Sequence, residues 1–540
     1  MPGLTMDYQL TLAALARRAE ALFGDRPVVS RRADGAFHRS TWYATLRRAH
    51  RLASALRGLG VASGDRVATL CWNHDRHLEA YFAVPLLGAV LHTLNLRLHP
   101  DELAYIARHA EDRVVIVDQA LLPLLERFRQ RVELRHVIVI GDGGAPPPGM
   151  LDYEALLADA PEARPALPEL DEHAAAAMCY TSGTTGRPKG VVYSHRALVL
   201  HSMATAMGGA FGLSAADTVL AVIPMFHANA WGLPFTTALT GAGLVFPGMH
   251  LDPAALLELC QQERVTFSAG VPTVWLGVLE RLDACPGAYD LSALRTIVIG
   301  GAAAPDSLVR GLEERHGIRV LTSWGMTEIA PVGTLGVLTP EGGELPEDER
   351  HALRMKAGVP GALLELRVRN DEGEVPWDGR TMGELEVRGA YVASAYYRPE
   401  EDGGWFTADG WFRTGDIATI DARGYLEIRD RTKDLIKSGG EWISSVDLEN
   451  AIMGHPAVQE AAVIAVPHPK WSERPLAVIV LRPGATAAAS DIRAHLSKQF
   501  VKWMVPDAYV FVNAIPRTST GKFLKTKLRE QYRDWQWTES

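Results

Sequence analysis

Three neighbouring stretches decide the fold: GDRVATL at 64–70, HLEAYFAVPLLGAVLH at 77–92 and DRVVIVD at 112–118. The first and third are short apolar runs rich in β-branched residues, and the stretch between them is amphipathic. This order is typical of a βαβ unit. Similar runs, each ended by Gly or Pro as buried parallel strands tend to be, recur at 136–141, 218–224, 238–248, 295–301 and 318–325. About the first 350 residues are therefore predicted to form a doubly wound α/β body.

The pattern changes after that body. From about 357 to 429, short alternating strands separated by turn residues predict a small β subdomain. A polar segment, DRTKDLIKSGGEW, comes next and leads into an α+β pattern with helices at 446–453 and near 489–503. We therefore predict an N-terminal domain at 1–429, a hinge at 430–435 and a small mobile C-terminal domain at 436–540.

The composition is that of an ordinary soluble enzyme. Of 540 residues, 47% are hydrophobic and 22% are charged, and 55 basic against 64 acidic residues give a net charge of -9. This balance argues against a nucleic-acid partner. The amino terminus reads as an amphipathic helix without the apolar core of a signal peptide, and no apolar run is long enough to span a bilayer. The four cysteines are too far apart for a disulfide framework or a metal clip. We expect a cytoplasmic protein.

The segment YTSGTTGRPKG at 180–190 is the most specific in the chain. Its glycines let main-chain N–H groups turn toward an anion, its hydroxyls add donors or metal ligands, and its lysine adds a charge. The spacing does not match a nucleoside-triphosphatase loop. We expect a strand, a phosphate-binding loop and then a helix begun by Ser194; the alternative is a flexible surface loop. The candidate phosphate contacts are Thr181, Ser182, Gly183, Thr184, Thr185 and Lys189.

Four later segments follow in order: SWGMTE at 323–328, GWFRTGD at 410–416, DRTKDLIKSGGEWIS at 430–444 and PRTSTGK at 516–522. With the loop at 180–190, they resemble the signatures of the adenylate-forming superfamily over nearly the whole chain. The contexts EAYFAVPLLGAVLHTLN, PMFHANAW and GEWISSVDLENAIMGHP are most similar to bacterial medium- to long-chain fatty acyl-CoA synthetases. The resemblance implies that ATP and a carboxylic acid form an acyl-adenylate and pyrophosphate, and that coenzyme A (CoA) then takes the acyl group.

The resemblance also assigns the nucleotide side. It implies that Glu328 and Thr184 hold Mg²⁺ against the triphosphate, a role suited to oxygen ligands. Trp324 would stack on adenine, where the family usually has tyrosine. Asp416 would accept from the ribose hydroxyls, a role suited to two carboxylate oxygens. The remaining nucleotide contacts implied in this way are Gly301, Ala302, Thr322, Ser323, Thr327 and Arg431.

Two segments of the C-terminal domain carry the expected chemistry. Lys522 matches the lysine that bridges the substrate carboxylate and ATP, although a lone lysine in a loop is usually only a solvated charge. Lys433, Lys437 and Trp442 lie in the segment that the family brings to the nucleotide after the small domain turns about Asp430. The motion has a reason, because the two half-reactions need different groups at the same carbon.

His227 and Trp231 are the candidate acyl-side residues. By resemblance, Trp231 would gate the acyl pocket and His227 would line the adenylate side as a catalytic residue, whereas a His and a Trp near an apolar strand are more often core residues. Several alternatives stay open: a ligase for a short or methylthio-substituted acid, a module that loads a carrier protein, and a noncatalytic acyl-binding homologue. The fatty acyl relatives also suggest a homodimer.

Overall fold

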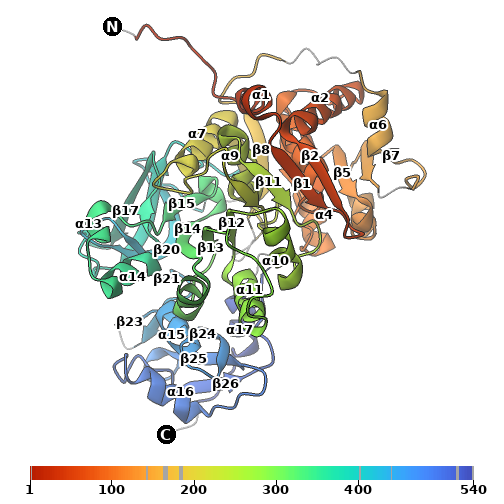
Figure 1. Ribbon diagram of the computed structural model, residues 1–540. Helices are drawn as coiled ribbons and strands as arrows, with labels where there is room; N and C mark the ends of the chain where they lie inside the picture. The colour runs from red at the N-terminus through yellow and green to blue at the C-terminus, as the bar shows by residue number, and fades with distance from the viewer. Residues whose placement is uncertain are drawn as a thin grey trace.

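The computed structural model describes residues 1, 3–141, 144–161, 168–181, 187–400, 403–438, 441–518 and 522–537. The fold consists of two large sheets, a small antiparallel sheet and a C-terminal lobe (Figure 1). Among these described residues, no helix is both long and apolar enough to cross a membrane.

The first large sheet contains the strands predicted at 64–70 and 112–118. Its order is β7-β6-β5-β3-β4-β8-β9, and every neighbouring pair is parallel except β8 with β9. The helix α3 (Asp75–Leu86) connects β3 to β4, so the stretch at 77–92, predicted as one amphipathic element between two strands, contains a helix and the start of a strand. A second helix, α4 (Pro100–Ala110), then leads to β5. The strands are β3 (Arg66–Leu70), β4 (Val90–Thr93), β5 (Val114–Asp118), β6 (His136–Ile140), β7 (Leu151–Asp152), β8 (Ala175–Tyr180) and β9 (Gly190–Ser194).

The second large sheet has the order β16-β15-β14-β13-β12-β10-β11-β1-β2. Its central strands are parallel and its edges are antiparallel, with β2 at one end and β15 and β16 at the other. The strands are β1 (Pro27–Arg31), β2 (Phe37–Thr41), β10 (Thr218–Leu220), β11 (Gly243–Phe246), β12 (Phe267–Gly270), β13 (Thr296–Gly300), β14 (Arg319–Gly325), β15 (Val332–Leu335) and β16 (Val359–Pro360).

Helices cover both faces of each large sheet. One continuous apolar core joins the two sheets through a shared layer of helices, and two separate cores lie on the other faces. The shared helices are α1 (Leu12–Phe23), α2 (Trp42–Gly58), α3, α7 (His195–Ala206) and α9 (Leu233–Thr240). The other faces are covered by α4 (Pro100–Ala110) and α5 (Leu122–Glu126) on one sheet and by α10 (Pro253–Gln262), α11 (Pro272–Ala284) and α12 (Asp306–Arg310) on the other. The predicted doubly wound α/β body is confirmed.

The small antiparallel sheet forms the expected β subdomain. Its order is β18-β17-β19-β20-β21, built from β17 (Leu364–Asn370), β18 (Gly373–Glu374), β19 (Gly383–Gly389), β20 (Phe412–Ile420) and β21 (Leu426–Arg431). The last strand runs two residues past the predicted boundary at 429 because Asp430 and Arg431 pair with Ile417 and Asp416 of β20. The segment expected as a hinge therefore begins inside a strand.

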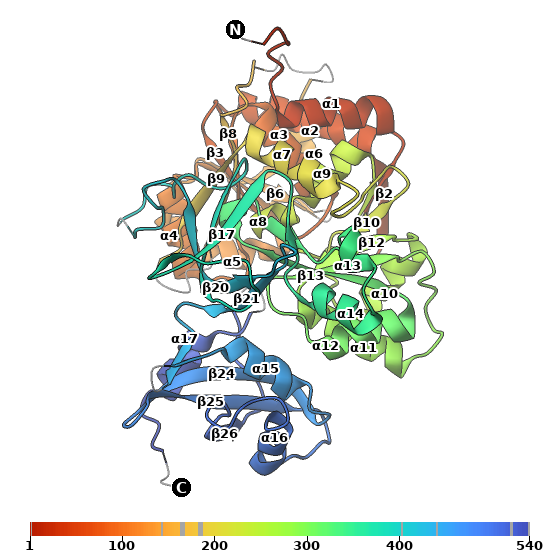
Figure 2. The same cartoon turned by 90° about the vertical axis from the view of Figure 1, so that its left-hand side faces the viewer.

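The C-terminal domain is a separate lobe at one end of the molecule (Figure 2). Its sheet has the order β23-β22-β25-β24, with β26 beside β25. The predicted helix near 489–503 is wrong beyond Leu496, because the N–H and the hydroxyl of Ser497 both donate to the Arg493 carbonyl and the chain then turns. The elements are β22 (Ile436–Ser438), β23 (Glu441–Ile443), α15 (Ser445–Met453), β24 (Val458–His468), β25 (Ser472–Leu481), α16 (Ala489–Leu496), β26 (Ala508–Phe511) and α17 (Lys525–Gln531).

Candidate active site

One large cavity, of about 520 Å³, lies where the α/β body, the β subdomain and the C-terminal domain meet. Its wall combines residues from segments that are far apart in the sequence, and most of the candidates that the sequence singled out are among them. The candidates that line it are Thr181, Lys189, His227, Trp231, Gly301, Ser323, Thr327, Glu328, Arg431, Lys433 and Lys522.

A strand, rather than the expected helix, comes directly after the phosphate loop. The loop leads into β9, which pairs with β8 in an antiparallel hairpin, and α7 begins only at His195. The N–H of Thr181 donates to the Lys189 carbonyl at 2.9 Å and the N–H of Lys189 to Oγ1 of Thr181 at 3.2 Å, so the ends of the loop are joined. The predicted strand-loop-helix order is therefore wrong, because the apolar run at 191–194 extends the sheet before Ser194 caps α7. The candidates Ser182, Gly183, Thr184 and Thr185 lie outside the described residues.

Trp324 and Asp416 lie just behind the cavity wall and are bonded to each other. The indole N–H of Trp324 donates to Oδ2 of Asp416 at 2.8 Å, and Nε of Arg431 lies 2.6 Å from Oδ1 of the same carboxylate. Asp416 is buried on β20. Its Oδ1 is paired with the Arg431 guanidinium, and its Oδ2 accepts from the Trp324 indole. The sequence pointed to these three residues separately, and the structure joins them in one network.

Four other candidates are not brought into the cavity wall that the described residues form. The hydroxyl of Thr322 donates to the carbonyls of Arg354 and Lys356, so it serves the packing of that segment. Lys437 and Trp442 face each other on the β22–β23 hairpin, with Nζ of Lys437 4.5 Å from the indole centroid, and Trp442 is 40% exposed. Ala302 is exposed beside the strand end that carries Gly301.

Lys522 reaches the cavity from the C-terminal domain. A Cβ added to Gly301 would lie 3.8 Å from Cε of Lys522, so the lysine stem passes over the end of β13. Burial, followed by repulsion from Arg431, lowers the pKa of Lys522 to about 8. Burial raises the pKa of Glu328, which is 5% exposed, and lowers that of His227 to about 4, helped by the charges of Lys522 and Arg97. Lys522 and Glu328 are thus a cation and a carboxylate of the cavity wall whose charged forms are both costly there.

Trp231 separates this cavity from a second, smaller one of about 50 Å³. His227, Trp231 and Val271 line both spaces, and the remaining lining of the small cavity is mostly aliphatic. The indole lies against the end of β13, because a Cβ on Gly300 would come within 3.0 Å of it. The arrangement suits an apolar group on one side of the indole and a polar one on the other.

The short turn α8 (Ala228–Trp231) that carries Trp231 is left-handed. Its four residues have φ between 42° and 54°, and Gly232 continues at 76°. Each non-glycine residue in this conformation costs about 1–2 kcal/mol relative to the right-handed one. Such strain persists only where the surroundings hold it, and it concentrates at functional positions.

Two aromatic residues of the cavity wall were missed by the sequence argument. The hydroxyl of Tyr396 donates to Oε1 of Glu328 at 2.5 Å, and the ring of Trp405 lies 4.4 Å from Nζ of Lys189. The signal that would have found them is the density of aromatic side chains at 396–412, a range that leads into the GWFRTGD motif at 410–416.

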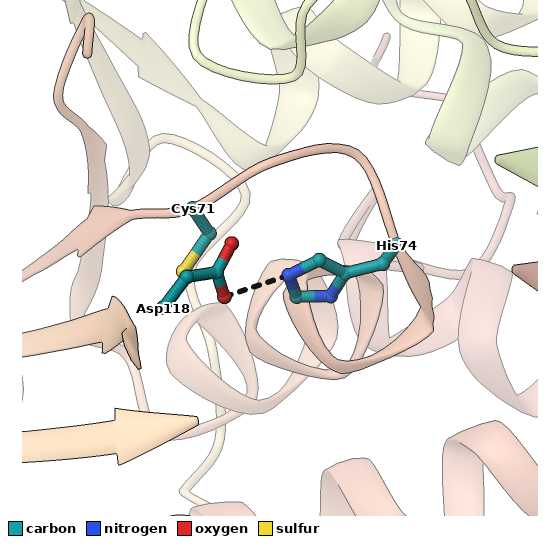
Figure 3. Close-up of side chains that lie close together, drawn as sticks. All are labelled: Cys71, His74 and Asp118. Atoms are coloured by element: carbon teal, nitrogen blue, oxygen red, sulfur yellow. Dashed lines mark hydrogen bonds and ion pairs between the residues drawn. The ribbon is translucent and has the colours of Figure 1, made fainter. Parts of the chain in front are cut away.

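A buried cluster of Cys71, His74 and Asp118 superficially resembles a metal site, since its ligand atoms lie within 4.8 Å of one another (Figure 3). The N–H of His77 donates to Nδ1 of His74 at 3.1 Å, so the ring proton is on Nε2, which donates to Asp118 at 2.8 Å. Neither imidazole nitrogen then offers a lone pair to a metal. The other Asp118 oxygen accepts from the N–H of Trp72, and burial raises the pKa of the Cys71 thiol. We interpret the cluster as a closed structural network at the ends of β3 and β5.

Comparison with known proteins identifies what this arrangement resembles. Residues 15–397 match the AMP-binding enzyme family, and residues 447–522 match the AMP-binding enzyme C-terminal domain. The chain is 53% identical to a long-chain-fatty-acid–CoA ligase of Thermus thermophilus over 99% of this chain and 98% of that protein. It is 43% identical to a 3-methylmercaptopropionyl-CoA ligase of Ruegeria lacuscaerulensis, with 99% of each chain covered. The fold matches the crystal structure of an anthranilate CoA ligase in complex with anthranoyl-AMP, with a TM-score of 0.86, 28% identity and 98% of each chain covered.

Proposed function

The chain belongs to the AMP-binding enzyme family, whose adenylate-forming fold it shares, and from that membership we propose that it is an AMP-forming acid–CoA ligase for medium- to long-chain fatty acids. The observation that carries the proposal is the reach of Lys522 from the C-terminal domain into the large cavity, beside Gly301 and within the electrostatic influence of Glu328 and Asp416. A cation at that point meets the two anions that the first half-reaction must bring together, a carboxylate and the α-phosphate of ATP.

In the first half-reaction, the protein's task is to position two anions and to neutralise the charge that develops as they react. Lys189 and the loop that precedes it would hold the β- and γ-phosphates. The Asp416 carboxylate would accept from the ribose hydroxyls, with Arg431 and Trp324 fixing its orientation. Lys522 would donate to the attacking carboxylate and the α-phosphate, in the protonated form that its pKa of about 8 allows near neutral pH.

Magnesium fits the carboxylate in this wall. Glu328 is an oxygen ligand of the kind that Mg²⁺ prefers, it is buried, and Tyr396 binds only its Oε1. We propose that Glu328, with Thr184 of the loop, holds the ion, which would neutralise phosphate charge when bound. Tyr396 would keep the carboxylate from rotating.

The acyl group is assigned to the small cavity beyond Trp231. Its wall is mostly aliphatic, with Arg97 as its one charged residue among those described, and the left-handed turn under Trp231 stores strain that a change of backbone conformation would release. We propose that the indole moves aside when a longer chain enters. His227, with a pKa of about 4, would be neutral in this role and would line the adenylate side.

The second half-reaction is assigned to a different orientation of the C-terminal domain. Among the described residues, Lys437 and Trp442 lie outside the cavity wall, whereas Lys522 is part of it. We propose that rotation about Asp430 withdraws Lys522 and brings the β22–β23 hairpin to the nucleotide. Lys433, already in the cavity wall beside the strand end at Arg431, would stay near the phosphate in both orientations.

A ligase for a short or methylthio-substituted acid is the second candidate. Two observations favour it: the relative named for 3-methylmercaptopropionyl-CoA covers the whole chain, and the acyl cavity is small in this conformation. Both candidates use the same chemistry and differ in pocket volume, where one methylene changes specificity by only about 1–3 kcal/mol.

The deciding measurement is pyrophosphate release with ATP and magnesium across straight-chain acids from acetate to stearate and with 3-methylthiopropanoate, each with and without CoA. A CoA-dependent maximum at octanoate or longer supports the fatty acyl ligase. A maximum at a shorter acid keeps the mechanism and changes the substrate. A single turnover that CoA does not extend would indicate a carrier-protein acceptor.

We further propose a cytoplasmic homodimer. The homodimer rests on the fatty acyl context of the sequence, and the compartment on its enzyme-like composition. Light scattering of the purified chain measures the mass directly, and fractionation of the host cell measures the compartment. A monomeric mass or a membrane-pelleted protein would contradict them.

A further inference from the structure

A strap from the β subdomain contacts Lys189 and Gly190, directly after the phosphate loop. We define the strap as residues 393–400 and 403–405, which belong to the described part of the chain between β19 and β20. Its Ala393 N–H donates to the carbonyl of Glu328 at 2.7 Å, and its Tyr397 N–H donates to the carbonyl of Gly190 at 2.8 Å. The strap is therefore fixed by its backbone both to the carboxylate segment and to the residue after Lys189.

The strap places two aromatic rings around the Lys189 ammonium. Nζ of Lys189 lies 4.4 Å from the ring centroid of Trp405 and 5.2 Å from that of Tyr396. The two rings meet edge to face, with centroids 4.8 Å apart and planes at 84°. Both line the large cavity, as Lys189 does. Trp and Tyr faces within about 6 Å attract an ammonium group electrostatically, most strongly where water is partly excluded.

Tyr396 connects this aromatic cage to Glu328. Its ring is one wall of the cage, and its hydroxyl donates to Oε1 of Glu328 at 2.5 Å. Tyr396 and Glu328 are both buried, so this bond is shielded from water. One tyrosine thus sets the position of a cation and of a carboxylate on the same side of the cavity.

We propose that Trp405 and Tyr396 are positioning residues for the triphosphate of ATP, because they hold Lys189 in place before the nucleotide arrives. A lysine side chain loses considerable rotamer freedom when it is fixed, and that loss weakens binding if it occurs at the moment of binding. A ring contact occupies one side of the ammonium and leaves N–H groups on the other side for phosphate oxygens. This inference rests on the proposed function and adds to it the residues that select for the β- and γ-phosphates.

The cage acts only on the phosphates that Lys189 reaches. Ligands without β- and γ-phosphates should therefore be indifferent to it, whereas a ring that merely packed the cavity wall would affect every nucleotide alike. The substitution Trp405→Leu keeps an apolar side chain but removes the ring face. Trp405→Phe keeps a ring, and Tyr396→Phe keeps the cage wall but removes the bond to Glu328.

Trp411 provides a matched control in the same subdomain. Two guanidinium groups contact its ring: the guanidinium carbons of Arg367 and Arg388 lie 4.4 and 4.6 Å from the ring centroid. Trp411 is buried and is not part of the cavity wall that the described residues form. Trp411→Leu therefore removes comparable cation contacts and aromatic packing at a distance from the nucleotide.

The experiment is calorimetric titration of the full chain and its variants with three ligands: a non-hydrolysable ATP analogue, AMP, and a sulfamoyl analogue of the acyl-adenylate. Trp405→Leu should weaken the ATP analogue about tenfold and change the other two by less than about twofold. Trp405→Phe should recover most of the affinity, and Trp411→Leu should bind all three ligands as the unaltered chain does. Tyr396→Phe should raise the magnesium concentration needed for half-maximal binding of the ATP analogue.

A double-mutant cycle keeps the test decisive if Trp405→Leu lowers stability. In a Lys189→Met background the ammonium is gone, so Trp405→Leu should cost no further affinity for the ATP analogue. Additive losses in that cycle would overturn the proposal, as would an equal loss of all three ligands or an unchanged affinity for the ATP analogue. Failure of the unaltered chain to bind the ATP analogue or AMP would instead contradict the proposed function itself.

Discussion

The C-terminal domain presents two lysine-bearing segments, and they differ in where they lie. Lys522 lies in the wall of the large cavity, where a Cβ on Gly301 would be 3.8 Å from Cε of the lysine. The β22–β23 hairpin holds Lys437 against Trp442, with that indole 40% exposed. Both segments carry glycine beside lysine, so local composition does not explain the difference. The difference follows from the orientation of the C-terminal domain, which places Lys522 in the cavity wall and the hairpin outside it.

The contrast matches the arrangement that the proposed first half-reaction requires. The cation in the cavity is the one expected to bridge two anions, and the segment expected to serve thiol transfer is outside it. The hinge region itself is well bonded: Oδ2 of Asp430 accepts from the N–H of Ser445 at 2.6 Å, and Nζ of Lys525 lies 2.7 Å from Oε1 of Glu449. A change of orientation must therefore rearrange particular bonds next to β21.

The largest expected effect comes from replacing Lys522, the lysine of the C-terminal domain that lines the large cavity. Lys522→Ala should slow pyrophosphate release by about a thousandfold, because a positioned charge in a water-poor site contributes that much to a charged transition state. Transfer of a presynthesised acyl-adenylate to CoA should stay within a few-fold of the unaltered rate. Rapid-quench assays of the two half-reactions measure both. An equal loss of rate in both half-reactions would show that Lys522 and the β22–β23 hairpin do not each serve a separate half-reaction.

The next effect concerns pH and acts on the same lysine. With a lowered pKa of about 8, Lys522 loses its proton as the pH rises through that value, so pyrophosphate release should fall about tenfold per unit above it. The sign follows from the role, since only the charged form can bridge two anions. Transfer from a presynthesised acyl-adenylate should not share this basic limb. Lys522→Arg, whose charge persists, should shift the limb to higher pH even where it lowers the rate.

A smaller effect, on the second half-reaction instead of the first, is expected from the β22–β23 hairpin outside the cavity. Trp442→Ala removes the ring that Lys437 faces at 4.5 Å, and we expect it to slow acyl transfer to CoA about tenfold while pyrophosphate release is unchanged. Single-turnover transfer from the preformed adenylate gives the rate. A matched control is Trp471→Ala, since that exposed indole also lies against a lysine, Lys470 at 4.7 Å, on the neighbouring β24–β25 turn. If both substitutions, or neither, slow the transfer, the hairpin has no particular role in it.

The sequence predicted more of the fold than of the site, for physical reasons. Runs such as 64–70 and 112–118 carry their own strand signal, and they form β3 and β5. The strand β9 was missed because its five residues were read as the approach to the helix that Ser194 begins. The helix predicted near 489–503 was wrong at its end, because the turn at Ser497 depends on side-chain bonds that periodicity does not contain.

The site divides in the same way. Motifs identified Lys189, Glu328, Asp416 and Lys522, because each stands in a distinctive local pattern. The contacts among them depend on residues that are distant in the chain, such as Trp324 with Asp416, and no local pattern contains those pairs. Tyr396 and Trp405 were missed for that reason, since each acquires its place only when the strap lies beside Gly190.

The smallest change in overall rate is expected on the acyl side, which belongs to neither of the two segments. Trp231 lines both the large and the small cavity, so a chain that passes it should remain there while the C-terminal domain turns. Trp231→Ala should therefore change the relative rates for short and long acids by a few-fold, and by the same factor in both half-reactions. The apparent ATP affinity should stay nearly unchanged. Rates for butyrate, octanoate and palmitate measure the profile, and Trp231→Phe is the control that keeps a ring over Gly300. A shift confined to one half-reaction would mean that the acyl pocket is rebuilt when the domain turns, whereas an unchanged profile would make Trp231 a core residue that only fills space.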